Sequence, residues 1–300
     1  MASGVAGCYQ GAMSPLVATG PNAEQITYWN EVYAPKWLRF QQVLDQQLGA
    51  LGRMAMERAA IHPGERVLDV GCGCGNTTLE LARRVGREGS VVGIDVSTPM
   101  LDRALESARA AEIANVAFWN ADAQMHPLPP AAFDLVYSRF GVMFFVDPAK
   151  AFTNLGRALR PGGRVCFVCW QALERNPWMA VPMAAAAREI TLPSRPGPEA
   201  PGPFSFADPD RVRRILVEAG LTDVTLEGCE TMLGIGGTGA LNDGVEFLVE
   251  MGPIGAALRD AGASFRPRVV EAVKQAIAPF HGPQGLRMPS AVWLVHARRQ

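Results

Sequence analysis

Three glycines and one aspartate stand where an apolar stretch gives way to a helical pattern. The segment VLDVGCGCGNTT (67–78) contains Asp69, Gly71, Gly73 and Gly75. Glycines so spaced let a ligand lie against the backbone at the start of a helix, where N–H groups are free. We therefore predict a small-molecule site at this turn.

The spacing of these glycines argues against a dinucleotide. A dinucleotide fingerprint reads G-x-G-x-x-G, and its third glycine would fall at position 76, which is Asn76. Asp69 lies two residues before the first glycine, where a carboxylate repels a pyrophosphate and attracts an ammonium or sulfonium group. S-adenosylmethionine carries both cations and no phosphate, so it fits this turn better than a nicotinamide dinucleotide.

Further candidate residues follow the next two predicted strands. Asp95 ends SVVGID and is suited to accept both hydroxyls of a ribose. In the segment NADA (120–123), Asp122 can accept from an adenine amino group, and the N–H of Ala123 can donate to the ring. Met100 can pack on the adenine face. Each residue has an alternative role without a ligand: Asp95 can cap a helix, Asp122 can form an Asx turn, and Met100 can pack in the core.

The elements that must position these residues alternate between strand and helix. Apolar strands are predicted at 66–70, 90–94, 115–119, 133–138 and 164–170, and helices at 77–85, 99–111 and 148–159. Thr77 and Glu80 are spaced as a capping box for the first of these helices. Apolar strands separated by helices predict a doubly wound parallel sheet, whose ligands bind at the carboxyl ends of the strands.

The rest of the chain is predicted to frame this core. We expect a flexible tail (1–23), an N-terminal helical cap (24–60) in which Pro35 separates two helices, and a cofactor-binding core (61–170). A Pro-rich insertion (171–207) follows. Residues 208–300 complete the sheet, with strands predicted at 223–227 and 291–297, and contain a helical insertion at about 230–285. We expect the two insertions to form a lid over the molecule that reacts with the cofactor.

With these motifs in their order along the chain, the sequence resembles the class I S-adenosylmethionine-dependent methyltransferases. It is particularly similar to the bacterial small-molecule group that includes the ubiquinone/menaquinone-biosynthesis enzymes. The matching stretches are VLDVGCGCG, VVGIDVSTPML, NADA, FDLVYSRFGVMFF and LRPGG. The resemblance implies a Rossmann-like seven-stranded sheet with the last strand antiparallel. It places Ser138 at the tip of the fourth strand, nearest the methyl group, and Arg139 beside it as a cofactor or acceptor contact.

Two sets of site residues follow from the motifs and the resemblance. The predicted cofactor residues are Asp69, Gly71, Gly73, Gly75, Asp95, Val96, Met100, Asp122, Ala123 and Ser138. The predicted substrate-pocket residues are Tyr28, Trp29, Arg139, Phe140, Met143, Phe144, Trp170 and Trp178. The second set is apolar and aromatic, which suits an apolar or aromatic acceptor, although ordinary core packing is the alternative for each member.

No catalytic base is evident. His126 and His281 are weak candidates, with a surface histidine as the alternative reading of each. We predict no metal, because no cysteine pair recurs with zinc spacing. Cys166 and Cys169 lie three apart on one predicted strand and so face opposite sides of the sheet.

Composition and charge limit the partners. Hydrophobic residues are 48% of the 300, charged residues are 19% and the net charge is −1, so the chain is not disordered and a nucleic-acid partner is not expected. No secretory signal or membrane span is expected, and a cytoplasmic location is the default. The expected partner is a small-molecule acceptor, and the sequence leaves open whether the chain forms a homodimer.

The sequence thus predicts a methyltransferase that moves a methyl group to an oxygen, carbon or nitrogen of a small, mostly apolar or aromatic metabolite by in-line displacement. Two alternatives stay open: a nicotinamide-dependent oxidoreductase on a related fold, and an S-adenosylmethionine-binding homologue without catalysis. The acceptor and the methylated atom are not specified by the sequence.

Overall fold

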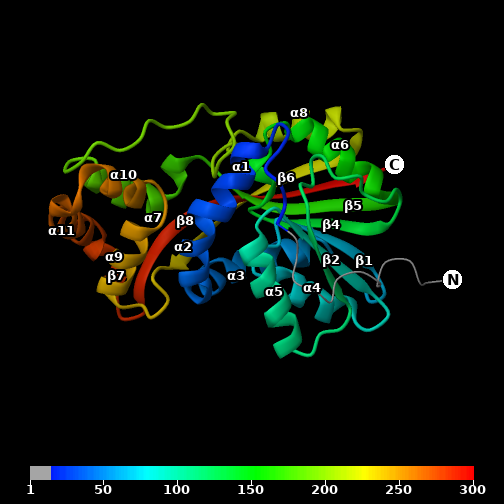
Figure 1. The fold of residues 1–300 in the computed structure, drawn as a ribbon, viewed down its shortest axis with the longest axis horizontal. Coiled ribbons are helices and arrows are strands. Elements are labelled where there is room, and N and C mark those ends of the chain that lie inside the picture. The colour runs from blue at the N-terminus through cyan, green and yellow to red at the C-terminus, as the bar shows by residue number, and fades with distance from the viewer. Residues whose placement is uncertain (1–14) are drawn as a thin grey trace.

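The computed structural model describes residues 15–300 and arranges them around one mixed sheet (Figure 1). The strands are β1 (Arg66–Val70), β2 (Ser90–Asp95), β3 (Val116–Asn120), β4 (Phe133–Arg139), β5 (Leu159–Trp170), β6 (Leu221–Gly234), β7 (His281–Gly282) and β8 (Gly285–Arg299). The strand order is β3-β2-β1-β4-β5-β8-β6, and β7 pairs with β8 outside this path. β8 is antiparallel to both β5 and β6, whereas the first five strands are parallel. The predicted fold class is confirmed, with the two-residue β7 as an addition.

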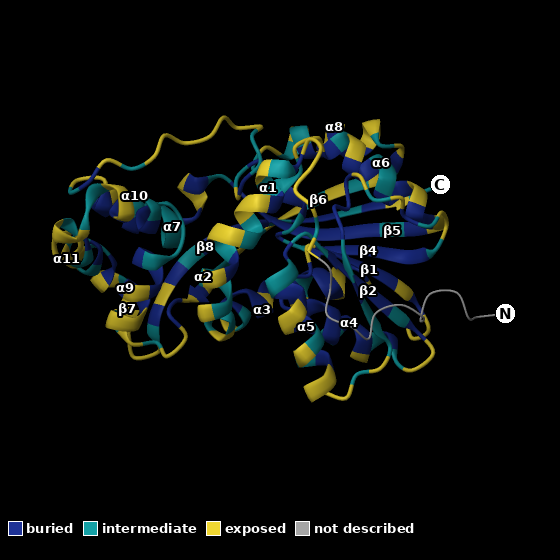
Figure 2. Cartoon of the chain, viewed as in Figure 1, coloured by how far each residue is buried: buried dark blue, intermediate teal, exposed yellow. Residues whose placement is uncertain are grey.

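Helices cover both faces of the sheet. They are α1 (Ala23–Thr27), α2 (Ala34–Arg39), α3 (Gln41–Arg58), α4 (Asn76–Val85), α5 (Thr98–Ala110), α6 (Pro148–Ala158), α7 (Pro177–Ala186), α8 (Pro209–Glu218), α9 (Leu241–Glu250), α10 (Pro253–Ala261) and α11 (Arg266–Ile277). Helices α3, α4 and α5 lie on one face, and α6 and α8 lie on the other (Figure 1). Because both faces are covered, the central strands are buried along nearly their whole length (Figure 2).

The two predicted insertions meet in one helical lobe. Helix α7 packs against α11, and α9 packs against α10 and α11, at the left of Figure 1. A two-stranded ribbon of β6 and β8 carries this lobe past the carboxyl edge of the sheet. Trp170 at the end of β5 pairs with Val292, whereas Gly234 at the end of β6 pairs with Arg287 further along the ribbon. The lobe therefore lies beyond the strand tips, where a ligand of such a sheet binds.

The N-terminal helices break at a different residue from the one predicted. The chain is helical without interruption from α1 through a π-helical turn (Tyr28–Tyr33) to α2, and the break falls at Phe40. Pro35 lies in the first turn of α2, directly after the π-helical turn. The missing N–H of proline is tolerated in a first turn, so Pro35 starts a helix there and does not end one.

The predicted tail is partly outside the described residues. Residues 1–14 are not described, but 15–22 are, and two of them are bound to the core. The backbone N–H of Leu16 donates to Asn120 Oδ1, and the side chain of Asn22 bonds to Asp122. The division of the chain into the predicted segments otherwise remains a prediction.

Candidate cofactor site at the strand tips

The glycine turn requires glycine at each of its three predicted positions. Gly71, Gly73 and Gly75 have φ values of 69°, 54° and 82°, a region that other residues rarely adopt. A Cβ on Gly73 would lie 2.9 Å from the Met100 side chain, and one on Gly75 would lie 2.9 Å from Ala104. Close packing of the turn against α5 therefore excludes larger residues.

Asp69 has one carboxylate oxygen without a partner. Its Oδ2 accepts from the hydroxyls of Thr77 (2.7 Å) and Thr78 (2.6 Å), so the predicted capping box at Thr77 is wrong. The start of α4 is instead formed by Gly75. Asp69 Oδ1 is buried and has no hydrogen-bond partner among the described residues, and burial raises the pKa of this carboxyl to about 6. An unpartnered buried oxygen of this kind fits a bound ammonium group.

Asp95 links the second strand to the glycine turn. Its Oδ2 accepts the N–H of Gly73 at 2.8 Å, and its Oδ1 accepts the N–H of Ser97 at 2.9 Å. Burial raises the pKa of Asp95, and these backbone donors act in the opposite direction. Each carboxylate oxygen can accept more than one hydrogen bond, so both retain capacity for ribose hydroxyls.

Asp122 is already engaged by a residue that sequence reasoning missed. Its Oδ2 accepts from the Asn22 amide at 2.7 Å, and its Oδ1 accepts the N–H of Gln124 at 2.9 Å. The Asn22 amide is the same kind of donor as the amino group of adenine. No local pattern identifies Asn22, because its partner lies 100 residues away in the sequence.

The N-terminal segment closes over the tips of β2 and β3. The Asn30 amide donates to the Val96 carbonyl at 2.9 Å and accepts the N–H of Thr98 at 2.9 Å. Met100 and Cys74 are buried in a small cluster with four residues of the N-terminal helices: Trp29, Ala34, Trp37 and Leu38. The predicted cofactor residues Val96 and Met100 therefore lie directly beneath the N-terminal helices.

Ser138 braces two strand tips together. Its hydroxyl donates to the Val70 carbonyl at 2.8 Å and accepts the N–H of Gly141 at 3.2 Å. A Cβ on Gly141 would lie 2.6 Å from the Val70 oxygen and 2.8 Å from Gly71 Cα. The β4 tip thus touches the glycine turn through backbone, a contact that sequence reasoning missed. A glycine just past a strand end was the available signal.

Arg139 follows Ser138 and is nearly buried, its side chain being 9% exposed. Its guanidinium donates to Asn76 Oδ1 at 3.0 Å and lies 3.5 Å from Asp45 Oδ1. Arg139 therefore ties the β4 tip to the first residue of α4 and to α3.

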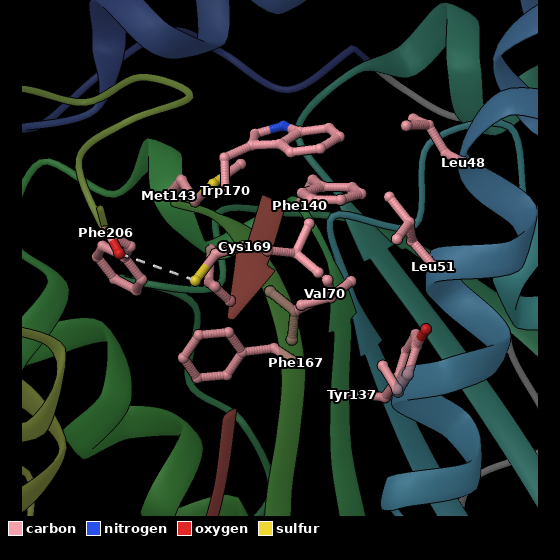
Figure 3. Packing of buried hydrophobic residues seen from close by; sticks show 14 of the residues in the cluster. Leu48, Leu51, Val70, Tyr137, Phe140, Met143, Phe167, Cys169, Trp170 and Phe206 are labelled. Atoms are coloured by element: carbon pink, nitrogen blue, oxygen red, sulfur yellow. Dashed lines mark hydrogen bonds between the residues drawn. The ribbon is translucent and has the colours of Figure 1, made fainter. Parts of the chain in front are cut away.

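The predicted pocket aromatics form two groups. Phe140 stacks on Trp170 with ring centroids 4.2 Å apart and an interplanar angle of 11°, and Trp178 lies 5.1 Å from Trp170. Figure 3 shows Phe140, Trp170 and Met143 together above the end of β5. Trp29 meets Phe144 edge-on at 4.9 Å in the second group, which Tyr28 joins through Trp29. Phe140 has a φ of 61°, a strained conformation for a residue with a side chain.

The two candidate bases lie away from these groups. His126 packs on Trp119, and its carbonyl accepts from Asn154 of α6, on an outer face of the sheet. His281 is exposed in β7 and pairs with Leu286 of β8. Leu286 lies six residues along β8 from Val292, the residue that pairs with Trp170. That is about 20 Å at the usual rise per strand residue. His281 is therefore far from the strand tips, whereas His126 lies near the end of β3, where its backbone N–H donates to the Asp122 carbonyl at 2.7 Å.

Nothing in the described part of the chain suggests a metal centre. Residues 15–300 contain no group of three or more His, Cys, Asp or Glu side chains that could hold an ion. The thiol of Cys166 points to the Ala55 carbonyl of α3, and that of Cys169 points to the Phe206 carbonyl on the other face (Figure 3). Burial raises the pKa of both thiols.

An open groove of about 850 Å³ lies over α2, α3 and the first residue of α4. Its lining residues are Leu38, Arg39, Gln41, Gln42, Asp45, Gln46, Arg53, Asn76 and Arg103. None of the predicted cofactor residues lines it. The ends of β2 and β3 are instead covered by Leu16, Asn22 and Asn30, which hydrogen-bond to residues there.

Comparison with known proteins agrees with this geometry. Residues 67–163 match the family model described as a methyltransferase domain. Aklanonic acid methyltransferase DauC of Streptomyces sp. strain C5 is 34% identical over 39% of this chain and 53% of its own length. The ubiquinone/menaquinone biosynthesis C-methyltransferase UbiE of Teredinibacter turnerae is 36% identical over 38% of this chain and 46% of its own length. The chain therefore spans about half the length of these relatives.

Among solved structures, phosphoethanolamine N-methyltransferase 2 of Haemonchus contortus has a similar fold. It superposes with a TM-score of 0.58 at 18% identity, over 92% of this chain and 59% of that one. At this identity the likeness concerns the fold alone.

The sheet order and the glycine turn define a Rossmann-like nucleoside-binding domain. With the family match, the chain carries a class I S-adenosylmethionine-dependent methyltransferase domain, and in this domain it resembles the ubiquinone/menaquinone C-methyltransferases. S-adenosylmethionine is the cofactor of this class. The residues present fit it, because the unpartnered buried oxygen of Asp69 suits its ammonium group and would repel a pyrophosphate.

Proposed function

We propose that this chain transfers the methyl group of S-adenosylmethionine to a small, mostly apolar or aromatic metabolite. The observation that carries the proposal is the pair of carboxylates at adjacent strand tips, of which Asp69 is buried and Asp95 is partly buried. Asp69 keeps a free oxygen beside the glycine turn, and Asp95 is held against the same turn by the Gly73 N–H. Two negative charges at this position favour a cationic, phosphate-free nucleoside.

Each strand tip has a separate task in this proposal. Asp69 binds the ammonium group, Asp95 accepts the ribose hydroxyls, and Asp122 accepts the adenine amino group in place of Asn22. The Val96 and Ala123 backbones and the Met100 side chain border the nucleoside. The contact between Gly71 and Gly141 leaves only backbone beside the reacting centre, so an acceptor can approach closely.

The bound cofactor supplies an activated methyl group on a sulfonium. The protein must align the acceptor with the methyl carbon and exclude water, and alignment alone can lower the barrier by roughly 7–11 kcal/mol. The Phe140–Trp170 stack and the Trp29–Phe144 pair suit this role, because aromatic walls are dry and stabilise a nearby cation. Because His281 is far from the strand tips and the His126 ring packs against Trp119, the proposal assigns no general base, and the acceptor ionises readily or is nucleophilic as a neutral molecule.

The relatives support this acceptor class by their names, which refer to aklanonic acid and to ubiquinone and menaquinone biosynthesis. A cytoplasmic location and action without nucleic acid remain parts of the proposal. Of the described residues, no helix has the length and apolar character to cross a membrane.

Incubation of the protein with S-adenosylmethionine labelled at the methyl group, and a panel of phenols, quinols and other small aromatics, tests the proposal. We expect label in at least one aromatic product and stoichiometric S-adenosylhomocysteine. Binding of S-adenosylhomocysteine with no labelled product from any acceptor would favour the non-catalytic alternative. A heat-treated sample provides the background.

A further inference from the structure

Gln47 in α3 carries a side-chain amide with no hydrogen-bond partner. The residue is 4% exposed, and both Oε1 and Nε2 are buried without a partner among the described residues. Burying an unpaired amide costs free energy, so such a group in a native fold requires an explanation. A bound molecule that supplies both partners would recover this cost.

The position of Gln47 on its helix relates it to the proposed acceptor site. Gln47 follows Phe40 by seven residues and precedes Leu51 by four, which puts the three on one side of the helix. Phe40 contacts Phe247 of α9 in the helical lobe, with ring centroids 5.5 Å apart. Leu51 belongs to the buried cluster that contains Phe140 (Figure 3). Gln47 therefore lies between the lobe and the aromatic tip of β4.

The chemistry of an amide limits what can bind there. Oε1 accepts a hydrogen bond and Nε2 donates, and the two atoms lie side by side. Their complement is a molecule with an adjacent donor and acceptor, such as a carboxamide or a hydroxy-ketone. The Phe140–Trp170 stack, which Figure 3 shows close to Leu51 one helical turn after Gln47, favours a planar ring carrying that group.

We propose that Gln47 determines acceptor specificity by pairing with a donor and an acceptor held side by side on a planar aromatic molecule. This inference rests on the proposed function, because it assigns the acceptor of that same site.

Two naphthalenes and two variants test the inference. 2-Naphthamide carries the donor and the acceptor, whereas 2-acetylnaphthalene carries the acceptor alone. Their affinities are measured by calorimetry in saturating S-adenosylhomocysteine, for wild type, Gln47→Met and Gln46→Met. Methionine preserves the size of the side chain, and Gln46 is the adjacent, exposed glutamine of the same helix, so it is the matched control.

We expect wild type and Gln46→Met to bind 2-naphthamide about five- to tenfold more tightly than 2-acetylnaphthalene. Gln47→Met should lose this preference while its affinity for S-adenosylhomocysteine stays unchanged. An equal preference in wild type and Gln47→Met overturns the inference, and so does an absence of binding by both naphthalenes.

Failure of the proposed function is distinguishable in the same experiment. If wild type does not bind S-adenosylhomocysteine, the proposed function fails and this inference fails with it. If S-adenosylhomocysteine binds and the preference does not depend on Gln47, only this inference fails.

Discussion

The carboxylate of Asp69 is satisfied on one oxygen only, and this asymmetry concentrates negative charge on the side without a partner. Two threonine hydroxyls hold Oδ2, and burial raises the pKa of the group to about 6. The raised pKa indicates that the folded protein resists ionising Asp69 unless a cation is present. A bound ammonium group is such a cation, so cofactor binding and ionisation of Asp69 should be coupled.

Affinity for S-adenosylhomocysteine should therefore rise with pH through about 6. If only ionised Asp69 binds, the affinity at pH 5 should be about tenfold lower than at pH 7. Asp69→Asn should bind weakly at both values and lose this pH dependence. Calorimetric titrations at several pH values measure the effect, and an equal pH dependence in the variant would contradict the assignment.

The same shift predicts a change in the stability of the unliganded protein. The pKa of Asp69 is higher in the folded than in the unfolded state, so the stabilisation from this proton is complete below pH 4 and is lost as the pH rises through about 6. The Tm of Asp69→Asn should lack this decrease between pH 4 and 6. If the Tm of wild type and of Asp69→Asn changed with pH in the same way, the pKa of Asp69 would not be raised in the folded protein.

Asp95→Ala should weaken S-adenosylhomocysteine binding by about 2–4 kcal/mol, because it removes two hydrogen bonds to a charged acceptor. Asp102→Ala, on the exposed side of α5, is the matched control and should leave the affinity unchanged. Equal dissociation constants for wild type and Asp95→Ala would mean that the ribose lies elsewhere.

The positions of the site residues in the fold could be predicted from the sequence more readily than the distant residues that contact them. Asp69 and Asp95 lie at strand tips as predicted, because a strand followed by a glycine turn is a local pattern. Asn22 and Gln47 were missed, since each acquires its environment from segments remote in the sequence. Thr77 was assigned to a cap because the capping pattern cannot reveal a carboxylate eight residues before it.

At the scale of elements, two strand tips are joined through backbone. Gly141 has an ordinary φ of −83°, so its conformation suits any residue, and only close approach to β1 and the glycine turn requires glycine. The Ser138 hydroxyl reinforces the same junction. The relative position of these two tips sets the space beside the reacting methyl group.

Gly141→Ala should destabilise the protein by about 1–3 kcal/mol, because the new Cβ would overlap backbone that cannot move without separating β1 from β4. Turnover should fall as well. Chemical denaturation and the methyl-transfer assay measure both effects. Gly197→Ala, where a Cβ meets nothing within 4 Å, is the control, and equal effects of the two substitutions would contradict the steric account.

The short apolar strands were predicted closely, and the long edge strand rich in polar residues was not. The strand predicted at 66–70 coincides with β1. The strand predicted at 223–227 is the much longer β6, an edge strand that pairs only with β8 and alternates between exposed and partly buried residues. Its polar stretch offers no continuous apolar signal, which is why the strand was predicted too short.

At the scale of the whole molecule, the sheet and the helical lobe share one core. A single buried cluster extends from Val67 in β1 to Val269 in α11. The lobe, although built from two separated segments, is therefore expected to unfold together with the sheet.

Scanning calorimetry of the unliganded protein should show one cooperative transition. Saturating S-adenosylhomocysteine at about 100 times its dissociation constant should stabilise the fold by about 2.7 kcal/mol and move the whole transition upward. Two separate transitions, of which only one shifts with the ligand, would mean that the lobe is an independent domain.

Calorimetric titration of the wild-type protein with S-adenosylhomocysteine and, separately, with NAD is the most direct test of the cofactor assignment. The account predicts one S-adenosylhomocysteine per chain and no measurable heat from NAD, because the carboxylate of Asp69 beside the glycine turn repels a pyrophosphate. Tight binding of NAD with no binding of S-adenosylhomocysteine would contradict it.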